Sequence, residues 1–224
     1  MVARENGTCS TSVMSSDAIG AAAADRATAV TAGSAEPTAL ARNQAARRRR
    51  VLDAALRLAD EGGFEAVQMR DVAAAAGVAL GTVYRYFDSK ERLLLEANGE
   101  GVEALGRRLA EHPPAGASAA DRVVDVLNRA CHALTRRPEA TAAMVRAMGS
   151  ARPTEADVVR RITLAIDGII TSAMHPGEPT ERDLAVARIL SQVWFSSLIG
   201  WVGGVDQPER VAADLEVATR LLLD

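Results

Sequence analysis

Residues 77–90 read GVALGTVYRYFDSK, and this stretch determines how the rest of the chain is interpreted. It holds both tyrosines and the only lysine of the protein, although aromatic residues make up only 3% of the sequence. Gly77 suits a turn between two short helices, which the pattern places at residues 70–76 and 80–87. Two short helices joined by a glycine-containing turn indicate a helix-turn-helix motif.

The second of these helices is predicted to have two different faces. Ala79, Val83 and Phe87 are spaced four residues apart, so we expect this stripe to face the core. A helix in the major groove presents its N-terminal residues to base edges and its flanks to phosphates. The residues left for that task are Leu80, Gly81, Thr82, Tyr84, Arg85 and Tyr86. The alternative is that the two tyrosines are half-buried core aromatics.

Basic residues around the motif extend the predicted DNA-binding surface. Lys90, at the start of the following helix, is placed to bind a phosphate, and Arg70 is a further phosphate contact. Arg47 begins a run of four arginines in the preceding helix, which would add electrostatic attraction to DNA. The alternative is that this run is simply a solvated helix start. Residues 42–92 carry ten basic and seven acidic side chains, whereas residues 93–224 carry fourteen and eighteen. This asymmetry suggests a nucleic-acid face attached to a part with another task.

The whole chain is predicted to be all-α, with about nine helices. Residues 1–40 are rich in Ala, Ser, Thr and Gly, so we expect a disordered tail, within which Met14 is an alternative start to Met1. Apolar spacing predicts helices at 42–61, 70–76, 80–87, 90–110, 119–136, 138–148, 153–174, 180–202 and 207–223. Gly62 and Gly63 should end the first helix, and Ser89, Thr154 and Thr180 are candidate N-caps.

Composition excludes several classes of function. A net charge of −3 argues against a uniformly basic nucleic-acid binder. Two cysteines, Cys9 and Cys131, and three scattered histidines predict neither a metal site nor a structural disulfide. Residues 93–224 show no catalytic constellation, so we expect neither an enzyme nor a cofactor. We also expect no membrane-spanning stretch and no secretory signal, which predicts a cytoplasmic protein.

The segment VLDAALRLADEGGFEAVQMRDVAAAAGVALGTVYRYFDSKERLL, residues 51–94, resembles the N-terminal DNA-binding domain of TetR-family transcriptional repressors. The specific core of the match is G-T-[apolar]-Y-x-Y-F-x-[ST]-K. The resemblance implies a DNA-binding domain at 41–92, an effector-binding and dimerisation domain at 93–224, and a homodimer on a pseudo-palindromic DNA operator. Gln68 and Met69 depart from the family, which often has a threonine there, so the cap of the first short helix is weaker.

The second half of the chain contains helices that are apolar on more than one side. Such helices can enclose an apolar cavity with a few polar groups, which is typical of a small-molecule site. The candidate lining residues are Asn98, Leu105, Leu127, Asn128, Met144, Met148, Trp194 and Leu198. The alternative for each is an ordinary core position. Helices at 180–202 and 207–223 are broadly apolar and would pack into a four-helix interface in a two-fold dimer.

Several segments of this half resemble the KstR-type regulators of actinobacterial sterol catabolism. They are VLNRACHALTRRPEATAAMVRA at 126–147, GEPTE at 177–181 and ARILSQVWFSSLIGWV at 187–202. The resemblance implies a steroid acyl-CoA effector, whose phosphates Arg107, Arg108 or Arg146 would meet.

The sequence therefore predicts a ligand-responsive repressor, acting on genes of lipid or sterol catabolism and released from its operator by the effector. One alternative is a TetR-type regulator of a different hydrophobic effector, controlling drug-efflux or fatty-acid genes. The other is an all-α lipid carrier or enzyme that does not bind DNA.

Overall fold

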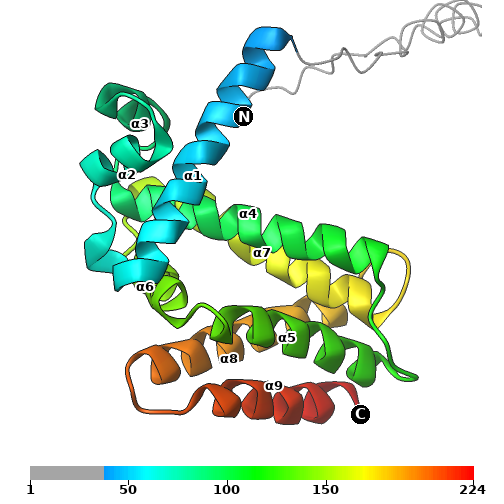
Figure 1. The fold of residues 1–224 in the computed structure, drawn as a ribbon. Coiled ribbons are helices and arrows are strands. Elements are labelled where there is room, and N and C mark those ends of the chain that lie inside the picture. The colour runs from blue at the N-terminus through cyan, green and yellow to red at the C-terminus, as the bar shows by residue number, and fades with distance from the viewer. Residues whose placement is uncertain (1–37) are drawn as a thin grey trace, which may run out of the picture. The chain divides into compact units, whose positions relative to one another are not determined.

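The structure, a computed structural model, describes residues 38–224 and is all-α, as predicted (Figure 1). The described residues form nine α-helices, a 3-10 turn at Pro153–Glu155, and no strand. The α-helices are α1 (Ala39–Ala66), α2 (Met69–Ala76), α3 (Leu80–Tyr86), α4 (Lys90–Glu111), α5 (Ala119–Thr135), α6 (Pro138–Gly149), α7 (Ala156–Met174), α8 (Glu181–Val202) and α9 (Pro208–Leu223). The predicted tail and the alternative start at Met14 lie outside the described residues, except that α1 begins at Ala39.

Glycines end the first two helices, as expected. In α1 the backbone leaves helical geometry at Gly62 and Gly63, and Gly63 has a φ of 65°. One further turn then reaches Ala66, so α1 is longer than the predicted segment at both ends. Gly77 follows α2 with a φ of 65°, a left-handed conformation that glycine adopts without steric cost.

Side-chain caps begin three of the later helices. Ser89 accepts a hydrogen bond from the Arg92 amide at the start of α4, as predicted. Ser118 and Thr180 each form a reciprocal capping box, at α5 and α8 respectively. Thr154 does not cap α7 as proposed, because it lies inside the 3-10 turn that precedes this helix.

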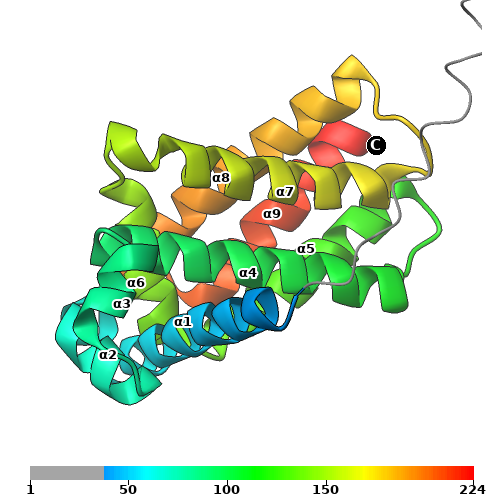
Figure 2. The same cartoon turned by 90° about the horizontal axis from the view of Figure 1, so that it is seen from above.

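Two clusters of buried apolar side chains hold residues 43–224 together as one compact unit. The first cluster joins α1–α4 to Ala140, Ala143 and Ala147 of α6 and to Val158 and Ile162 of α7. The second cluster is built from α5, α7, α8 and α9. Helix α7 belongs to both clusters and packs along α4, so these two helices connect the predicted DNA-binding half to the predicted ligand half (Figures 1 and 2).

Helix α8 bears on the expectation that the chain has no membrane-spanning stretch. Of the helices in residues 38–224, α8 alone is long and apolar enough to cross a membrane by length and composition, with a mean hydropathy of 1.3. In this fold α8 packs against α7 and α9, and it buries Val186, Ala187 and Leu190 in the second cluster. Its other side leaves Leu184, Ile189 and Ile199 exposed.

Candidate DNA-binding surface and ligand cavity

Helices α2 and α3 form the predicted helix-turn-helix. At the turn, the amides of Gly77 and Val78 donate to the carbonyls of Ala74 and Ala73, at 3.2 and 3.0 Å. The start of α2 is weak, as predicted from Gln68, because this side chain does not cap the helix. Its amide instead donates to the Glu65 carbonyl at 2.9 Å. The motif is thus fixed by its turn and by packing.

The inner side of α3 is anchored by two residues. Val83 is fully buried and Phe87, directly after the helix, is 1% exposed. Ala79, the third residue of the predicted stripe, is exposed, so that part of the prediction is wrong. The reason is local: Ala79 is the N-cap, with an extended backbone, so the helical spacing does not reach it.

The outer side of α3 presents large apolar groups to solvent. Tyr84 is 52% exposed and Leu80, one turn earlier, is 40% exposed. Gly81 and Arg85 are also exposed, while Thr82 is half-buried. Among residues 38–224, no atom beyond the chain neighbours and the backbone of α3 itself lies within 4 Å of the place where a Cβ on Gly81 would stand, so packing does not require this glycine.

Tyr86 is placed differently from Tyr84. It packs against the first core cluster, with its ring centroid 6.2 Å from that of Phe87 and the Arg85 guanidinium 5.4 Å from its own ring. Its hydroxyl is buried and has no hydrogen-bond partner among the residues that the structure describes. Tyr86 lies three residues after Val83 and therefore shares the buried side of α3. The alternative that the tyrosines are half-buried core aromatics is therefore correct for Tyr86, whereas Tyr84 faces solvent.

The only lysine of the chain is engaged within the protein. The ammonium of Lys90 lies 4.0 Å from the centroid of the Phe64 ring and 3.6 Å from the Glu65 carboxylate. Arg146 of α6 approaches the same two residues, at 4.3 Å from the ring and 2.8 Å from the carboxylate. Arg47 and Arg70 are exposed, and Arg70 pairs with Asp71 at 3.3 Å.

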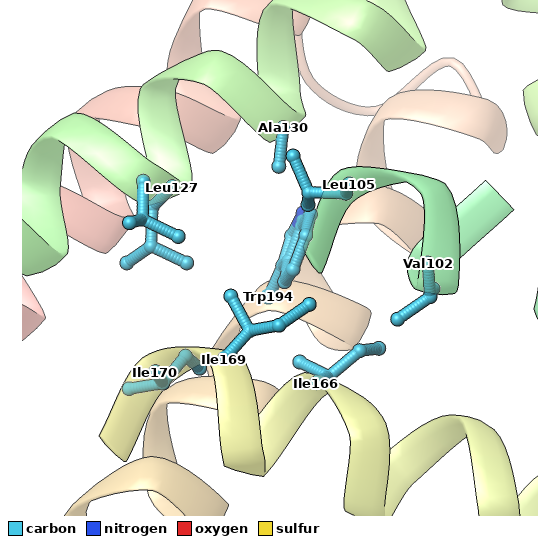
Figure 3. Close-up of a pocket in the computed structure, with 9 residues that line it drawn as sticks. Val102, Leu105, Leu127, Ala130, Ile166, Ile169, Ile170 and Trp194 are labelled. Atoms are coloured by element: carbon cyan, nitrogen blue, oxygen red, sulfur yellow. The ribbon is translucent and has the colours of Figure 1, made fainter. Parts of the chain in front are cut away.

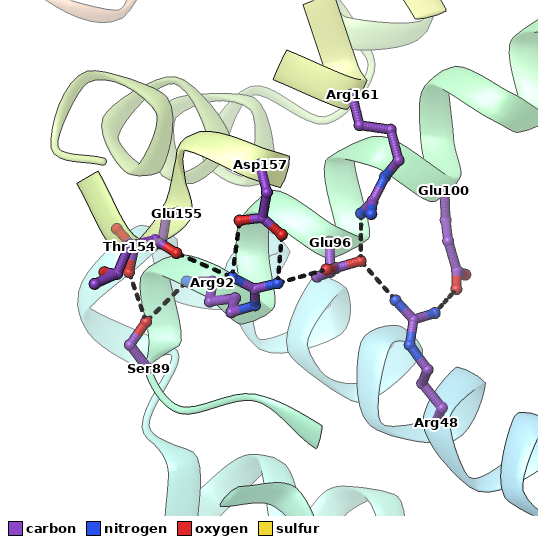
Figure 4. Close-up of polar contacts among 9 residues, drawn as sticks. All are labelled: Arg48, Ser89, Arg92, Glu96, Glu100, Thr154, Glu155, Asp157 and Arg161. Atoms are coloured by element: carbon purple, nitrogen blue, oxygen red, sulfur yellow. Dashed lines mark hydrogen bonds and ion pairs between the residues drawn. The ribbon is translucent and has the colours of Figure 1, made fainter. Parts of the chain in front are cut away.

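A cluster of ion pairs joins α1, α4 and α7 (Figure 4). Its centre is Glu96 of α4, whose side chain is 11% exposed. One Glu96 oxygen accepts hydrogen bonds from Arg48 of α1 and Arg161 of α7, both at 2.7 Å. Arg92 lies 3.7 Å from the other oxygen. We call Glu96 and these three arginines the Glu96 cluster.

Two further contacts tie the start of α4 to the start of α7. Arg92 donates two hydrogen bonds to Asp157, at 3.1 and 2.9 Å, and these bonds lower the pKa of that carboxyl. Glu155, 1% exposed, accepts hydrogen bonds from Arg152 and from the Ser89 hydroxyl, the latter at 3.0 Å. The Arg152 hydrogen bond is the main cause of the lowered pKa of Glu155.

An apolar cavity lies between α4, α5, α7 and α8 (Figure 3). Its volume is about 20 Å³, close to the space that one water molecule needs, so a larger ligand requires these helices to move apart. The lining residues are Val102, Leu105, Val126, Leu127, Ala130, Ile166, Ile169, Ile170 and Trp194.

The cavity contains three of the eight predicted ligand residues: Leu105, Leu127 and Trp194. The other five do not line it: Asn98, Met144 and Met148 are half-buried, Asn128 is exposed, and Leu198 packs against the second core cluster. The eight candidate residues include none from α7, which contributes three isoleucines to the lining. The signal was available, because Ile166, Ile169 and Ile170 recur at three- and four-residue spacing.

A second hollow runs between α1 and α4, with a volume of about 530 Å³. Arg107, one of the arginines expected to meet phosphates, lines it together with Arg48 and Arg49. Asp53, Glu100 and Glu103 line it as well, so three cations face three anions. This balance does not favour a polyanionic ligand.

Both halves of the chain match families of known proteins. Residues 51–97 match the family "bacterial regulatory proteins, tetR family", and residues 116–222 match the "tetracyclin repressor-like, C-terminal domain". The HTH-type transcriptional repressor KstR of Rhodococcus jostii is 43% identical over 180 residues, which cover 80% of this chain and 84% of that protein. KstR of Mycobacterium tuberculosis is 39% identical, with 80% and 82% covered. The crystal structure of a TetR transcriptional regulator from Rhodococcus sp. RHA1 is 34% identical, with a TM-score of 0.75, covering 81% of this chain and 97% of that one.

Proposed function

The chain belongs to the tetR family of bacterial regulatory proteins, and from this premise we propose that it is a homodimeric repressor released from its DNA operator by a hydrophobic ligand. Family membership makes it a transcriptional regulator with a helix-turn-helix and not an enzyme. The operator, the ligand class and the dimer are parts of the proposal. A regulator of this kind acts where the chromosome is, in the cytoplasm.

The outer side of α3 is the observation that carries the DNA-binding proposal. Val83 and Phe87 hold the helix to its domain, while Leu80 and Tyr84 stand exposed beside Gly81. A glycine inside a helix destabilises it by roughly 0.5–1 kcal/mol relative to alanine. Packing does not require Gly81, so the proposal assigns it to close approach of DNA. Thr82, Tyr84 and Arg85 then contact base edges and phosphates.

Phosphate contacts surround this helix in the proposal. Arg47 and Arg70 are exposed, and Arg70 would exchange its exposed partner Asp71 for the DNA backbone. Lys90 would leave Glu65 and Phe64 to bind a phosphate, since its present partners occupy it in the DNA-free chain. Tyr86 serves through packing, because its hydroxyl is buried.

The exposed apolar side of α8 and α9 supports the dimer. Leu184, Ile189 and Ile199 of α8 are exposed, as are Val217 and Leu221 of α9. Apolar surface of this kind marks an interaction site in a soluble protein. In a two-fold dimer, α8 and α9 of both chains would form a four-helix interface that buries this surface. The two copies of α3 would then stand about 34–36 Å apart, on successive turns of a pseudo-palindromic operator.

The apolar cavity supports a hydrophobic ligand. Its lining comes from α4, α5, α7 and α8, and the 43% identity to KstR makes a steroid acyl-CoA the first candidate. A ligand that widens the cavity displaces α4 through Val102 and Leu105. The same helix carries Glu96 and directly follows α3, so its movement would disturb the Glu96 cluster and the position of α3 together. Ligand and DNA then oppose each other by linkage.

A pair of glycine variants tests the DNA-binding part. Gly81→Ala and Gly168→Ala both place a methyl group in open space on a helix, so each should leave the fold intact or stabilise it slightly. We expect Gly81→Ala to weaken binding to operator DNA at least tenfold in fluorescence anisotropy, and Gly168→Ala of α7 to leave it unchanged. Equal affinities for the two variants and the parent would refute the assignment of α3.

A titration tests the ligand part. DNA fragments recovered from a random pool by the protein would be released by a steroid acyl-CoA and far less by palmitoyl-CoA. Release by palmitoyl-CoA alone would favour the regulator of another hydrophobic effector, and release by neither would count against ligand response in this class.

A further inference from the structure

Two cations from helices far apart in the sequence share the same two partners at the end of α1. Lys90, the first residue of α4, places its ammonium 4.0 Å from the centroid of the Phe64 ring and 3.6 Å from one carboxylate oxygen of Glu65. Arg146 of α6 places its guanidinium 4.3 Å from the centroid of the same ring and 2.8 Å from the other Glu65 oxygen. We call these four residues the Phe64 cluster.

The two cations of the Phe64 cluster are held in different ways. The side chain of Lys90 is 21% exposed, and its ammonium also donates to the Phe64 carbonyl at 3.4 Å. Arg146 is exposed, yet it makes the shorter contact with Glu65. Because the attraction between opposite charges grows as their distance falls, Glu65 is bound more strongly by Arg146 than by Lys90. The carboxylate that could hold the lysine is therefore engaged mainly by another cation.

We propose that Arg146 is a positioning residue for DNA binding, which acts by keeping Glu65 from holding Lys90. When Lys90 moves to a DNA phosphate, it gives up the Glu65 carboxylate and the Phe64 ring. Arg146 stays with both, so neither group loses its last cation when the lysine leaves. Without Arg146, the lysine would be the only cation of the cluster and would cost more to release.

This inference rests on the proposed function and deepens it. The proposed function assigns Lys90 to a phosphate, and the Phe64 cluster sets the cost of releasing that lysine. Arg146 lies within the residues that match the C-terminal domain, and its neighbour Ala147 is buried in the first core cluster. The position of α6 therefore acts on a DNA-facing lysine through Glu65, without using any residue of the Glu96 cluster.

Two variants that remove the same ion pair should change DNA affinity in opposite directions. Glu65→Gln releases Lys90, so we expect DNA selected from a random pool to bind about threefold more tightly in fluorescence anisotropy, an effect of the size of one exposed ion pair. Arg146→Met keeps an apolar contact with the Phe64 ring but removes the charge, so binding should weaken about threefold. A purely structural role of the ion pair would move both affinities the same way.

A third variant decides whether these effects pass through the lysine. Lys90→Met should itself weaken DNA binding, because it removes a phosphate contact, and Lys90→Gln serves the same purpose if the methionine variant does not fold. In this background most of the effect of Glu65→Gln and of Arg146→Met should be lost. Effects of full size would mean that Arg146 contacts DNA itself or acts by long-range charge alone, which overturns the inference.

Matched charge changes outside the Phe64 cluster provide the controls. Glu61 lies on α1 four residues before Glu65, and Arg136 lies at the end of α5; both are exposed. Glu61→Gln and Arg136→Met change the net charge as the two test variants do, so they should leave DNA affinity nearly unchanged. Control effects as large as those of the test variants would overturn the inference.

The outcomes separate the inference from the function on which it rests. If Lys90→Met binds DNA as tightly as the parent while Gly81→Ala binds it weakly, the inference is overturned and the proposed function stands. Weaker binding by Glu65→Gln also overturns the inference alone, because it would show a structural ion pair. If the parent selects no DNA from the random pool, the proposed function fails and the inference fails with it.

Discussion

Replacing Glu96 by glutamine should destabilise the chain by about 2 kcal/mol. The side chain is 11% exposed and accepts hydrogen bonds from Arg48 and Arg161, both at 2.7 Å. A hydrogen bond to a charged group contributes about 1.5–3 kcal/mol, and a neutral one about 0.5–1.5 kcal/mol. Glutamine keeps the size and one acceptor oxygen but loses the charge, so each of the two bonds is weakened by about 1 kcal/mol.

Urea denaturation followed by circular dichroism measures this change, with Glu103→Gln as the control. Glu103 lies on the same helix and is exposed, so its replacement changes the net charge equally without touching the Glu96 cluster. For a chain of this length, 2 kcal/mol corresponds to a fall in Tm of about 4–8 °C. Part of the loss should persist in 0.5 M salt, because buried pairs are screened less than exposed ones.

The reasoning would be refuted if Glu96→Gln and Glu103→Gln had the same free energy of unfolding to within about 0.5 kcal/mol. That result would mean that the cost of removing the carboxylate from water equals the gain from its arginines. The link between α1, α4 and α7 would then rest on apolar packing alone.

Two further predictions concern the turn and the loop that position these helices. Gly77→Ala should destabilise the chain by about 1–2 kcal/mol in the same denaturation assay, because the φ of 65° is unfavourable for alanine although a methyl group there would meet no neighbour. Gly168→Ala, at a helical position, should not destabilise the chain. A Gly77→Ala variant as stable as the parent would contradict this prediction, because the turn would then accept a different backbone conformation at residue 77. The hydrogen bond to Asp183, at 2.8 Å, raises the pKa of His175, so the pair contributes most stability below the ordinary histidine pKa of about 6.5 and loses it as pH rises through the raised value. The difference in free energy of unfolding between the parent and His175→Gln should therefore be larger at pH 5.5 than at pH 9, and a difference independent of pH would contradict the assignment.

Helix positions were predictable from the sequence because local signals agree with the fold. Helices α5 to α9 begin and end within a few residues of the expected ranges. Thr180 as the cap of α8 and the prolines that begin α6 and α9 are signals that can be recognised in the sequence. The exceptions arise where two signals compete. Pro153 begins a 3-10 turn instead of α7 itself, since Glu155 folds back on the Arg152 amide before the helix starts.

The predicted sites were less complete than the fold, for reasons of tertiary packing. The spacing of Val83 and Phe87 identifies the inner side of α3, and Tyr86 lies on it three residues after Val83. The spacing does not show that the Tyr86 hydroxyl is buried. Similarly, asparagines were proposed as polar ligand contacts, whereas the cavity is lined by aliphatic side chains and Trp194. Only the meeting of α4, α5, α7 and α8 distinguishes a cavity residue from an ordinary core residue.

The ion pairs of the Glu96 cluster could not be predicted from the spacing of residues in the sequence. Arg48, Glu96 and Arg161 are separated by 48 and 65 residues along the chain, and each alone is an ordinary charged helix position. Their convergence depends on how α1 and α7 cross α4. The same holds for Lys90, whose contact with Phe64 depends on the turn at Gly62 and Gly63.

The most direct test of the account is to measure operator affinity and ligand affinity on the same preparation of the protein. DNA selected from a random pool should contain a pseudo-palindrome, and its dissociation constant should rise in the presence of a steroid acyl-CoA. By linkage, saturating DNA should weaken the binding of that ligand by the same factor. A selected pool without a palindrome, or a ligand that binds tightly while the affinity for DNA stays the same, would contradict the account.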